Sequence, residues 1–333
     1  MKPFRMTLAA ALLAITTGSG PALAETIKAE GGSAAGLSAL VPQLLSKYAA
    51  ADHNVRVNID QTLTRAALKV ATGSIDLAVM PAGAYDKMIT GSGPYQNLKE
   101  QAIEASGNVR VLFSFLGGHV HAMTYADSGV ETWEDLRGQR VFVGPPAGTF
   151  SSQTTGMIEA ITGMKPGEDY EAIKLAWSAA NQAFEDGKFD VFMRSGTIGS
   201  AAIDQFGSAK KFRLLSVPAE SLETEAWVKY LAVPGRAADV LPAGTYQNQI
   251  NNDEDVMASA FVMFVGVNVD MAEQTAYDLT KAMFDNIDNA HSVNQGLKPL
   301  TLENATVSLN ARLHPGAIRY YEEQGLEIPA ELR

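Results

Sequence analysis

Three loops rich in glycine, serine and threonine have the chemistry to hold a small anion. They are Gly31-Gly32-Ser33-Ala34-Ala35-Gly36, residues 145–152, and Ser195-Gly196-Thr197, and each lies between a short apolar run and a helix-length segment. The first N–H groups of a helix have no partner within the helix, and the helix dipole favours negative charge there. We therefore expect these loops to receive a carboxylate or a similar anion. The competing interpretation, which we prefer for any single loop, is plain helix capping by Ser and Thr.

Charged and aromatic residues beside these breaks could complete such a site. Arg65 follows Thr62-Leu63-Thr64, and Arg194 lies at the carboxyl end of a predicted strand. A guanidinium can grip a carboxylate through two hydrogen bonds. Trp177, predicted to end a strand just before Ser178, and Phe150 could cover the apolar part of a ligand. The alternatives are a solvated helix position for Arg65 and core positions for the two aromatic residues.

His119 and His121 lie two residues apart on a predicted strand, so both side chains face one side. A metal site would need a third ligand, and no nearby carboxylate pattern supplies one. We therefore favour hydrogen-bonding roles at a crossing between two lobes. The sequence also lacks His-Glu-x-x-His, the phosphate-binding G-x-x-x-x-G-K-[ST], a G-x-G-x-x-G after a strand and a G-x-S-x-G elbow. We predict no catalytic residue, no metal and no cofactor, and a protein that is not an enzyme.

The elements that position these loops belong to a chain of 333 residues, enough for about two domains. Its net charge of −11 argues against a nucleic-acid binder, which needs clustered Lys and Arg. The absence of cysteine excludes disulfide frameworks, thiolate zinc sites and a lipid anchor on cysteine.

The first 24 residues are typical of a secretory signal peptide. Lys2 and Arg5 precede an apolar stretch at residues 6–15, and Ala22-Leu23-Ala24 fits the small-x-small cleavage rule. The apolar run is too short to span a bilayer as a mature helix. We expect cleavage after Ala24 and a periplasmic location; the alternative is a buried or anchoring N-terminal helix.

From residue 25 onward, short apolar runs alternate with helix-length segments. Runs are expected at residues 27–30, 55–60, 77–80, 109–116, 119–125, 140–144, 172–177, 191–194, 212–217 and 256–267, with a late helix at 271–289. This alternation predicts an α/β protein whose parallel-rich mixed sheets are flanked by helices. Gly117-Gly118 interrupts a long extended region and suits a passage between lobes. With a return between about residues 217 and 232, we predict one lobe from residues 25–116 and 222–333, and another from 117–221.

Several segments in order resemble the TAXI-type solute receptors of TRAP (tripartite ATP-independent periplasmic) transporters, over nearly all of the mature chain. The most specific covers residues 125–149, which include Asp135-Leu136-Arg137-Gly138 and Gly144-Pro145-Pro146-Ala147-Gly148-Thr149. Supporting segments are Gly73-Ser74-Ile75-Asp76, Ala84-Tyr85-Asp86, Gly91-Ser92-Gly93-Pro94-Tyr95, Leu241-Pro242-Ala243-Gly244-Thr245-Tyr246, Leu313-His314-Pro315-Gly316-Ala317 and Arg319-Tyr320-Tyr321.

The resemblance implies a type II periplasmic binding protein, in which two lobes close on a small organic anion in an interlobe cleft. It would deliver a carboxylate cargo to the subunits of a TRAP membrane permease, and we expect a monomer that binds no nucleic acid. Combining residues and resemblance, the predicted ligand-binding set is Gly32, Ser33, Ala34, Ala35, Thr62, Thr64, Arg65, Pro81, Ala82, His121, Thr149, Phe150, Ser151, Ser152, Trp177, Ser178, Arg194, Ser195 and Gly196.

This sequence departs from the family's pattern at three pocket loops. Ser33-Ala34-Ala35 stands where family members usually carry a Thr and two tyrosines. Asp60-Gln61-Thr62-Leu63 replaces the usual Thr-Gly-Gly-Ser, and Pro81-Ala82-Gly83 replaces Gln-Ser-Asp. Without the two aromatic rings that side of the site enlarges, so we hypothesise a cargo bulkier than glutamate or differently charged. The alternatives are a receptor for an ATP-driven (ABC) importer, which shares the two-lobed architecture, and a secreted hydrolase.

Overall fold

The computed structural model describes residues 26–34 and 36–333. The predicted signal peptide, with its cleavage after Ala24, and the predicted site residue Ala35 lie outside the described residues. Within that described part of the chain, no helix is both long and apolar enough to cross a bilayer.

Strands and helices alternate along the first two thirds of the chain, as the apolar runs predicted. The elements are β1 (Thr26–Glu30), α1 (Leu37–Tyr48), β2 (Asn54–Asn58), α2 (Leu63–Ala71), β3 (Leu77–Pro81), α3 (Ala82–Thr90), α4 (Lys99–Ser106), β4 (Val109–Tyr125), β5 (Arg140–Gly144), α5 (Phe150–Thr162), β6 (Glu171–Lys174), α6 (Trp177–Glu185), β7 (Val191–Gly196), α7 (Ala201–Asp204) and β8 (Phe212–Leu214). After them come α8 (Glu225–Leu231), β9 (Arg236–Leu241), β10 (Val256–Asn268), α9 (Glu273–Asp285), α10 (Ile287–Val293), the 3₁₀ helix η5 (Gln295–Leu297) and α11 (Pro315–Glu323).

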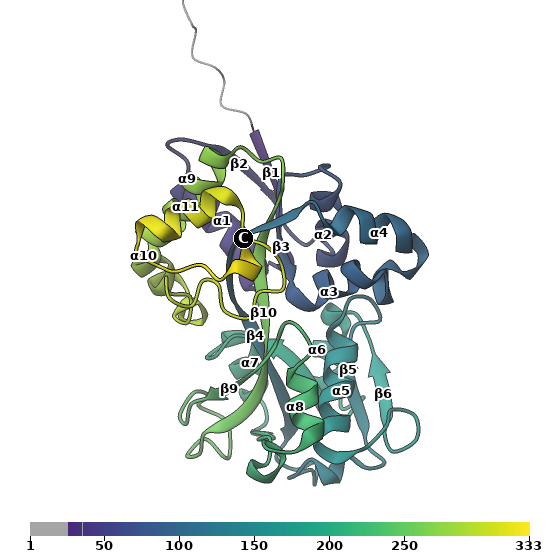
Figure 1. Cartoon of the computed structure of the whole chain (residues 1–333). Coiled ribbons are helices and arrows are strands. Elements are labelled where there is room, and N and C mark those ends of the chain that lie inside the picture. Colours follow the sequence, from purple (N-terminus) through teal and green to yellow (C-terminus); the bar gives the residue numbers. More distant parts are fainter. Residues whose placement is uncertain (1–25, 35) are drawn as a thin grey trace, which may run out of the picture.

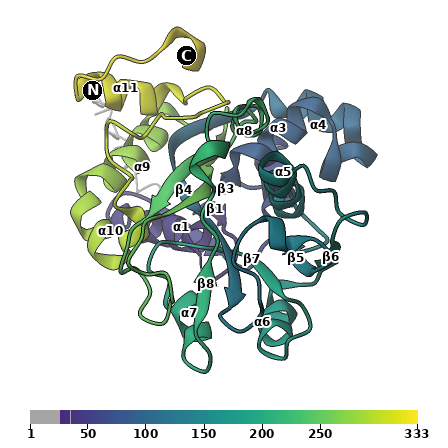
Figure 2. The same ribbon diagram turned by 90° about the horizontal axis from the view of Figure 1, so that it is seen from below.

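These strands form one mixed sheet in the order β2-β1-β3-β10-β4-β7-β5-β6, with β8 paired to β4 and β9 to β10. Pairing is parallel among β1, β2 and β3 and among β5, β6 and β7, whereas β10 runs antiparallel to β3 and β4. Helices flank the sheet, as the view from below shows (Figure 2). The predicted α/β class, with mixed pairing and flanking helices, is confirmed. The sheets were predicted to be parallel-rich, but the structure has a single sheet with four parallel and five antiparallel strand pairs.

Two long strands, β4 and β10, run through both lobes of the molecule (Figure 1). They pair from Val109 opposite Asn268 to His119 opposite Ala260. Between them the register shifts, because Leu116 pairs with Val262 and Gly118 with Phe261, which leaves Gly117 unpaired. An unpaired extra residue of this kind is a β-bulge, which bends and twists a strand locally. The glycine break that the sequence showed is thus a bulge inside one continuous strand.

The buried apolar side chains form three clusters. The first draws on the beginning of the chain up to Phe115 and on residues from Val262 onward. The second and third draw on residues 120–258, including Trp227, Tyr230 and Tyr246. The predicted return to the first lobe at residue 222 stays a prediction. The buried apolar residues between 222 and 258 pack within the second and third clusters, with residues 120–217, and not within the first.

Some element boundaries differ from the sequence predictions. The strand predicted at 172–177 ends at Lys174, and Trp177 begins α6 instead of ending a strand, because Ala176 takes an extended conformation as the N-cap. The helix predicted at 271–289 is two helices, α9 and α10, which meet at Asn286. β7 continues to Gly196, so Ser195 and Gly196 lie in a strand; the predicted loop there is wrong.

Candidate functional site

The glycine loop between β1 and α1 is held tightly by its own neighbours. A Cβ atom on Gly31 would lie 2.6 Å from the Ser38 carbonyl oxygen, and one on Gly32 would lie 2.5 Å from the Ser38 hydroxyl. These glycines are therefore required by close packing against α1. The exposed residues Ser33 and Ala34 follow them, and the Ala34 N–H donates to Asp60 Oδ1 at 3.0 Å. The Asp60 carboxylate thus already accepts a hydrogen bond from one of the loop amides that we expected to hold an anionic ligand.

The neighbouring predicted contacts in the first lobe have mixed surroundings. Thr62 and Arg65 are exposed at the start of α2, and Arg65 forms no ion pair within the described ranges. Thr64 is buried, and its carbonyl oxygen accepts the Tyr95 hydroxyl at 2.8 Å. Pro81 ends β3 and Ala82 begins α3, where the chain approaches the turn before β9: a Cβ on Gly235 would lie 2.7 Å from the Gly83 nitrogen.

The start of α5 offers amides that no side chain caps. Thr149 is the N-cap, yet its hydroxyl accepts no N–H of the first turn. The Ser152 hydroxyl instead donates to the Thr149 carbonyl oxygen at 2.7 Å, and the Thr155 hydroxyl donates to the Ser151 carbonyl oxygen at 2.9 Å. The competing interpretation, plain helix capping by Ser and Thr side chains, is therefore wrong for α5. The N–H groups of residues 150–152 thus have no acceptor among the described residues.

Arg194 and three aromatic rings form the most distinctive group, which we call the arginine cluster: Phe150, Trp177, Arg194 and Phe261. The guanidinium carbon of Arg194 lies 4.9 Å from the Trp177 ring centroid. The Trp177 centroid is 5.2 Å from that of Phe150, and Phe150 is 6.4 Å from Phe261. The cluster joins the ends of α5, α6 and β7 to the crossing strand β10. Three of its members were predicted from the sequence, and Phe261 was not.

The Arg194 guanidinium has few partners inside the protein. Its Nη1 donates to the Ser195 carbonyl oxygen at 2.8 Å, while Nε is buried and has no hydrogen-bond partner among residues 26–34 and 36–333. In the same part of the chain, no carboxylate forms an ion pair with it. Burial lowers the pKa of the Arg194 guanidinium from its usual value, but arginine stays protonated in proteins. A half-buried positive charge without a protein counter-ion favours an anion beside it.

The two histidines of β4 have hydrogen-bonding partners of their own. His119 Nε2 lies 2.7 Å from Asp239 Oδ2, and His121 Nε2 lies 2.7 Å from the Tyr246 hydroxyl. His121 is fully buried, which lowers its pKa to about 3. It therefore stays neutral near pH 7 and cannot offer a charge to a ligand; the ligand contact assigned to it from sequence has no support in the geometry. The described residues contain no group of three or more His, Asp or Glu that could hold a metal.

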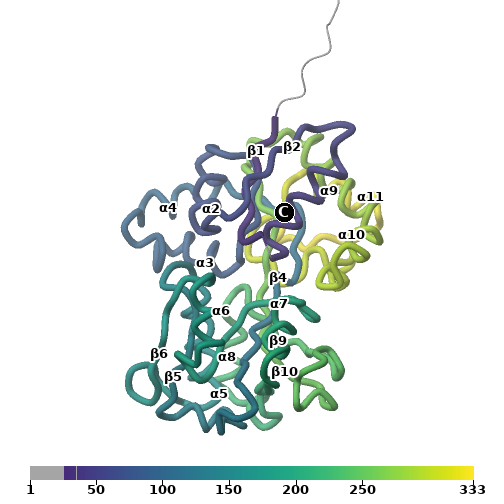
Figure 3. The backbone as a smooth tube through the Cα atoms, turned by 180° about the vertical axis from the view of Figure 1, so that it is seen from behind, coloured from purple at the N-terminus to yellow at the C-terminus, as the bar shows by residue number. Residues whose placement is uncertain are grey.

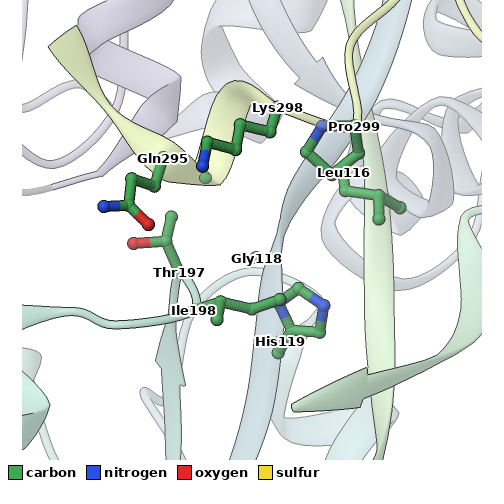
Figure 4. A pocket seen from close by; sticks show the side chains of 9 residues that line it. Leu116, Gly118, His119, Thr197, Ile198, Gln295, Lys298 and Pro299 are labelled. Carbon is green, nitrogen blue, oxygen red and sulfur yellow. The ribbon is translucent and has the colours of Figure 1, made fainter. Parts of the chain in front are cut away.

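A cavity of about 160 Å³ lies beside the bulge of β4, and we call it the hinge cavity. Its walls come from β4, from the segment after β7 and from η5 and the residues that follow it: Leu116, Gly118, His119, Thr197, Ile198, Gln295, Gly296, Lys298 and Pro299. Gln295, Thr197 and the amino end of Lys298 lie toward one end, and Leu116 and Pro299 toward the other (Figure 4). The sequence gave no signal for Gln295 or Lys298, because nothing local shows that η5 meets the segment after β7.

Ser178, Ser195 and Gly196 complete the predicted set. Ser178 is exposed on α6. Ser195 and Gly196 pair with Val120 and His119 of β4. Because hydrogen-bonded and non-hydrogen-bonded pairs alternate in an antiparallel ladder, at most one of their two N–H groups is bonded to β4. The structure thus brings Phe150, Trp177 and Arg194 together. The predicted contacts of the β1–α1 and β2–α2 loops stay predictions.

A model of the NMT1-like family matches residues 35–325. Among solved structures, the aliphatic sulphonate binding protein SsuA of Escherichia coli aligns with a TM-score of 0.48 at 14% identity, covering 92% of this chain and 88% of that one. A TRAP solute binding protein of Marinobacter aquaeolei aligns with a TM-score of 0.48 at 13% identity (90% and 91% covered). The ectoine-binding protein of the TeaABC TRAP transporter of Halomonas elongata gives 0.47 at 11% identity (90% of each). Similarity at this level identifies neither a ligand nor a transporter.

Proposed function

The chain belongs to the NMT1-like family, and from that premise we propose that it is a periplasmic solute receptor that captures a small organic anion between its lobes. The cargo is a carboxylate with an apolar body, delivered to a TRAP permease. The protein works as a monomer and does not transform its ligand. The resemblance of residues 125–149 to TAXI-type receptors supports the transporter class.

The observation that carries this proposal is the unpaired charge of Arg194. The guanidinium lies over Trp177, and its Nε has no protein partner in the described chain. A carboxylate beside it would receive charge-assisted hydrogen bonds, and Phe150 and Trp177 would cover the apolar remainder. The Asp60 carboxylate accepts the Ala34 N–H and so places a negative charge beside the β1–α1 loop. This side of the site is therefore the less favourable one for the anionic group of a ligand. The anionic group therefore faces the second lobe.

Closure uses the two crossing strands as its hinge. We place the first crossing at Gly117 and Gly118 of β4 and move the second from residues 217–232 to Phe261 of β10. The register shift opposite Gly117 supports this placement, because the backbone there is free of regular pairing. Contacts from both lobes exist together only in the closed form, so ligand binding shifts the open–closed population.

Calorimetric titration of the purified protein with a panel of carboxylates and sulfonates tests the proposal, together with mass spectrometry of any molecule that co-purifies. We expect one class of organic anion to bind with a Kd of about 0.1–10 μM. Small-angle scattering should show a smaller radius of gyration with the bound anion. Tight binding of glutamate alone would refute the bulkier cargo, and turnover of a bound compound would refute a receptor.

The transporter class needs a separate test, because an ABC importer uses receptors of similar architecture. The genes beside this one supply it: a many-helix permease without an ATPase supports TRAP, and an ATPase supports the ABC alternative. Uptake into vesicles that hold the neighbouring permease should then follow an ion gradient. Uptake that requires ATP would contradict the TRAP assignment while leaving the anion receptor intact.

A further inference from the structure

A second cavity, of about 460 Å³, lies in the first lobe beside the start of β4. Arg110 of β4 and Arg312 of the segment before α11 both line it, together with Tyr85 of α3 and Glu331 near the C-terminus. None of these residues belongs to the arginine cluster or the hinge cavity. The volume is in the range of cavities that bind small molecules.

The backbone fixes the two arginines as neighbours. Val111 and Leu313 form a parallel bridge, in which the Val111 N–H donates to the Arg312 carbonyl oxygen and the His314 N–H donates to the Val111 carbonyl oxygen, both at 2.9 Å. Arg110 and Arg312 each come one residue before this bridge, so the parallel register places them beside one another, and both line the cavity. Like charges placed opposite one another on adjacent strands are destabilising.

The protein does not neutralise this pair within the described residues. Arg110 Nη1 donates to the Gly107 and Val109 carbonyl oxygens, both at 2.8 Å. Neither arginine forms an ion pair in the described parts of the chain, and the exposed carboxylate of Glu331 makes none with them. Both charges act on the Tyr85 hydroxyl: burial raises its pKa, and Arg110 and Arg312 oppose that rise. The two guanidinium groups therefore share one cavity with an unmatched charge.

We propose that this cavity binds a small oxyanion, such as phosphate or a dicarboxylate, between Arg110 and Arg312. Two guanidinium groups side by side can offer several charge-assisted hydrogen bonds to one such anion. A bound anion would attract both guanidinium groups and so offset the repulsion between them. This site lies apart from the interlobe cluster and does not depend on the proposed transport function.

The test titrates the full mature protein with inorganic phosphate and, separately, with succinate at low ionic strength, followed by calorimetry and thermal unfolding. We expect saturable binding of at least one probe and a rise in Tm. Arg312→Gln should weaken that binding about tenfold or more. Arg312 is exposed, so this variant should fold; Arg110→Gln provides a second variant. Arg56→Gln, an exposed arginine on β2, is the matched control and should bind as the wild type does.

A second readout separates a ligand site from a structural pair. Without added anion, Arg312→Gln should be at least as stable as the wild type, because one repulsive charge is gone. At one fixed anion concentration, the wild type and Arg56→Gln should gain more Tm than Arg312→Gln does. Arg194→Gln should keep this binding even if it loses the interlobe ligand, which distinguishes the two sites. Unaltered affinity in both Arg110→Gln and Arg312→Gln, or no saturable binding of either probe, would overturn the proposal.

Discussion

The Arg194 guanidinium lies over the Trp177 ring, with 4.9 Å between its central carbon and the ring centroid. Arg194 comes from β7, which pairs with the crossing strand β4, and Trp177 is the first residue of α6. Contact with the ring restricts the guanidinium, so less conformational entropy is lost when an anion binds. The pair therefore holds a positive charge at the start of α6. In the backbone view, α6 lies in the part of the second lobe that is nearer the first (Figure 3).

Replacing Arg194 by Gln should weaken binding of the cognate anion by at least about tenfold, since charge-assisted hydrogen bonds are lost. Calorimetry measures the affinity, and circular dichroism checks the fold. Arg213→Gln on β8 removes the same charge from a half-buried position outside the cluster and should leave the affinity unchanged. Equal affinities for wild type and Arg194→Gln would remove Arg194 from the site.

The buried histidine of β4 should make the protein less stable in mild acid. The pKa of His121 is lowered to about 3 in the folded state. Burial, which disfavours the charged imidazolium, is the largest cause, and the charges of His119 and Arg194 add to it. In the unfolded chain the pKa is about 6.5. Below pH 6.5 the unfolded state therefore binds a proton that the native state does not, and the free energy of unfolding falls as the pH decreases.

Between pH 7 and pH 5 this histidine should cost about 2 kcal/mol of stability. Urea unfolding across that range measures the loss. His121→Gln should show a shallower dependence on pH, whatever its stability at pH 7, because the side chain that titrates is absent. The same slope in both proteins would show that His121 is protonated in the folded state.

Gly118→Ala should be destabilising by roughly 1–3 kcal/mol. Its φ of +149° is unfavourable for a side chain, and the added Cβ would lie 2.9 Å from the Gly196 carbonyl oxygen and 3.0 Å from Phe261 Cζ. Gly107→Ala is the control: its φ is −62°, and the nearest atom to a new Cβ is 3.6 Å away. Denaturant midpoints compare the two variants; similar midpoints would contradict the steric argument.

The sequence predicted those features that depend on local pattern. Apolar runs located the strands, and Gly117-Gly118 marked the place where the register of β4 shifts against β10. What it could not supply is which distant segments meet. β10 reads as an ordinary strand, yet its two ends serve different clusters, since Val256 packs with Tyr246 and Val265 with the first lobe.

Some residues have packing roles that the sequence did not show. Gly31 and Gly32 suggested room for a ligand, but both are needed because α1 packs closely at Ser38. Trp177 was expected at a strand end and instead begins a helix, where its ring can still reach Arg194. Local sequence gives a residue's conformational preference, and the atoms that it meets depend on tertiary packing.

The contact between η5 and the segment after β7 should control closure. A Cβ on Gly296 would lie 2.8 Å from both Thr197 Cβ and Thr197 Cγ2, so any side chain there pushes η5 and the segment after β7 apart. Gly296→Val should therefore favour the open form and weaken ligand binding, with Gly296→Ala in between. Calorimetry gives the affinities, and small-angle scattering gives the radius of gyration with and without ligand.

A compensating change makes this prediction sharper. Thr197→Gly removes the two atoms that a Gly296 side chain would meet, while keeping the carbonyl oxygen that lies 3.3 Å from the Tyr246 hydroxyl. The double variant Gly296→Val with Thr197→Gly should recover most of the affinity that Gly296→Val loses. Because residues in contact give non-additive effects, the recovery measures the contact itself. If the double variant is as weak as the two single changes added together, steric control of closure at this contact is wrong.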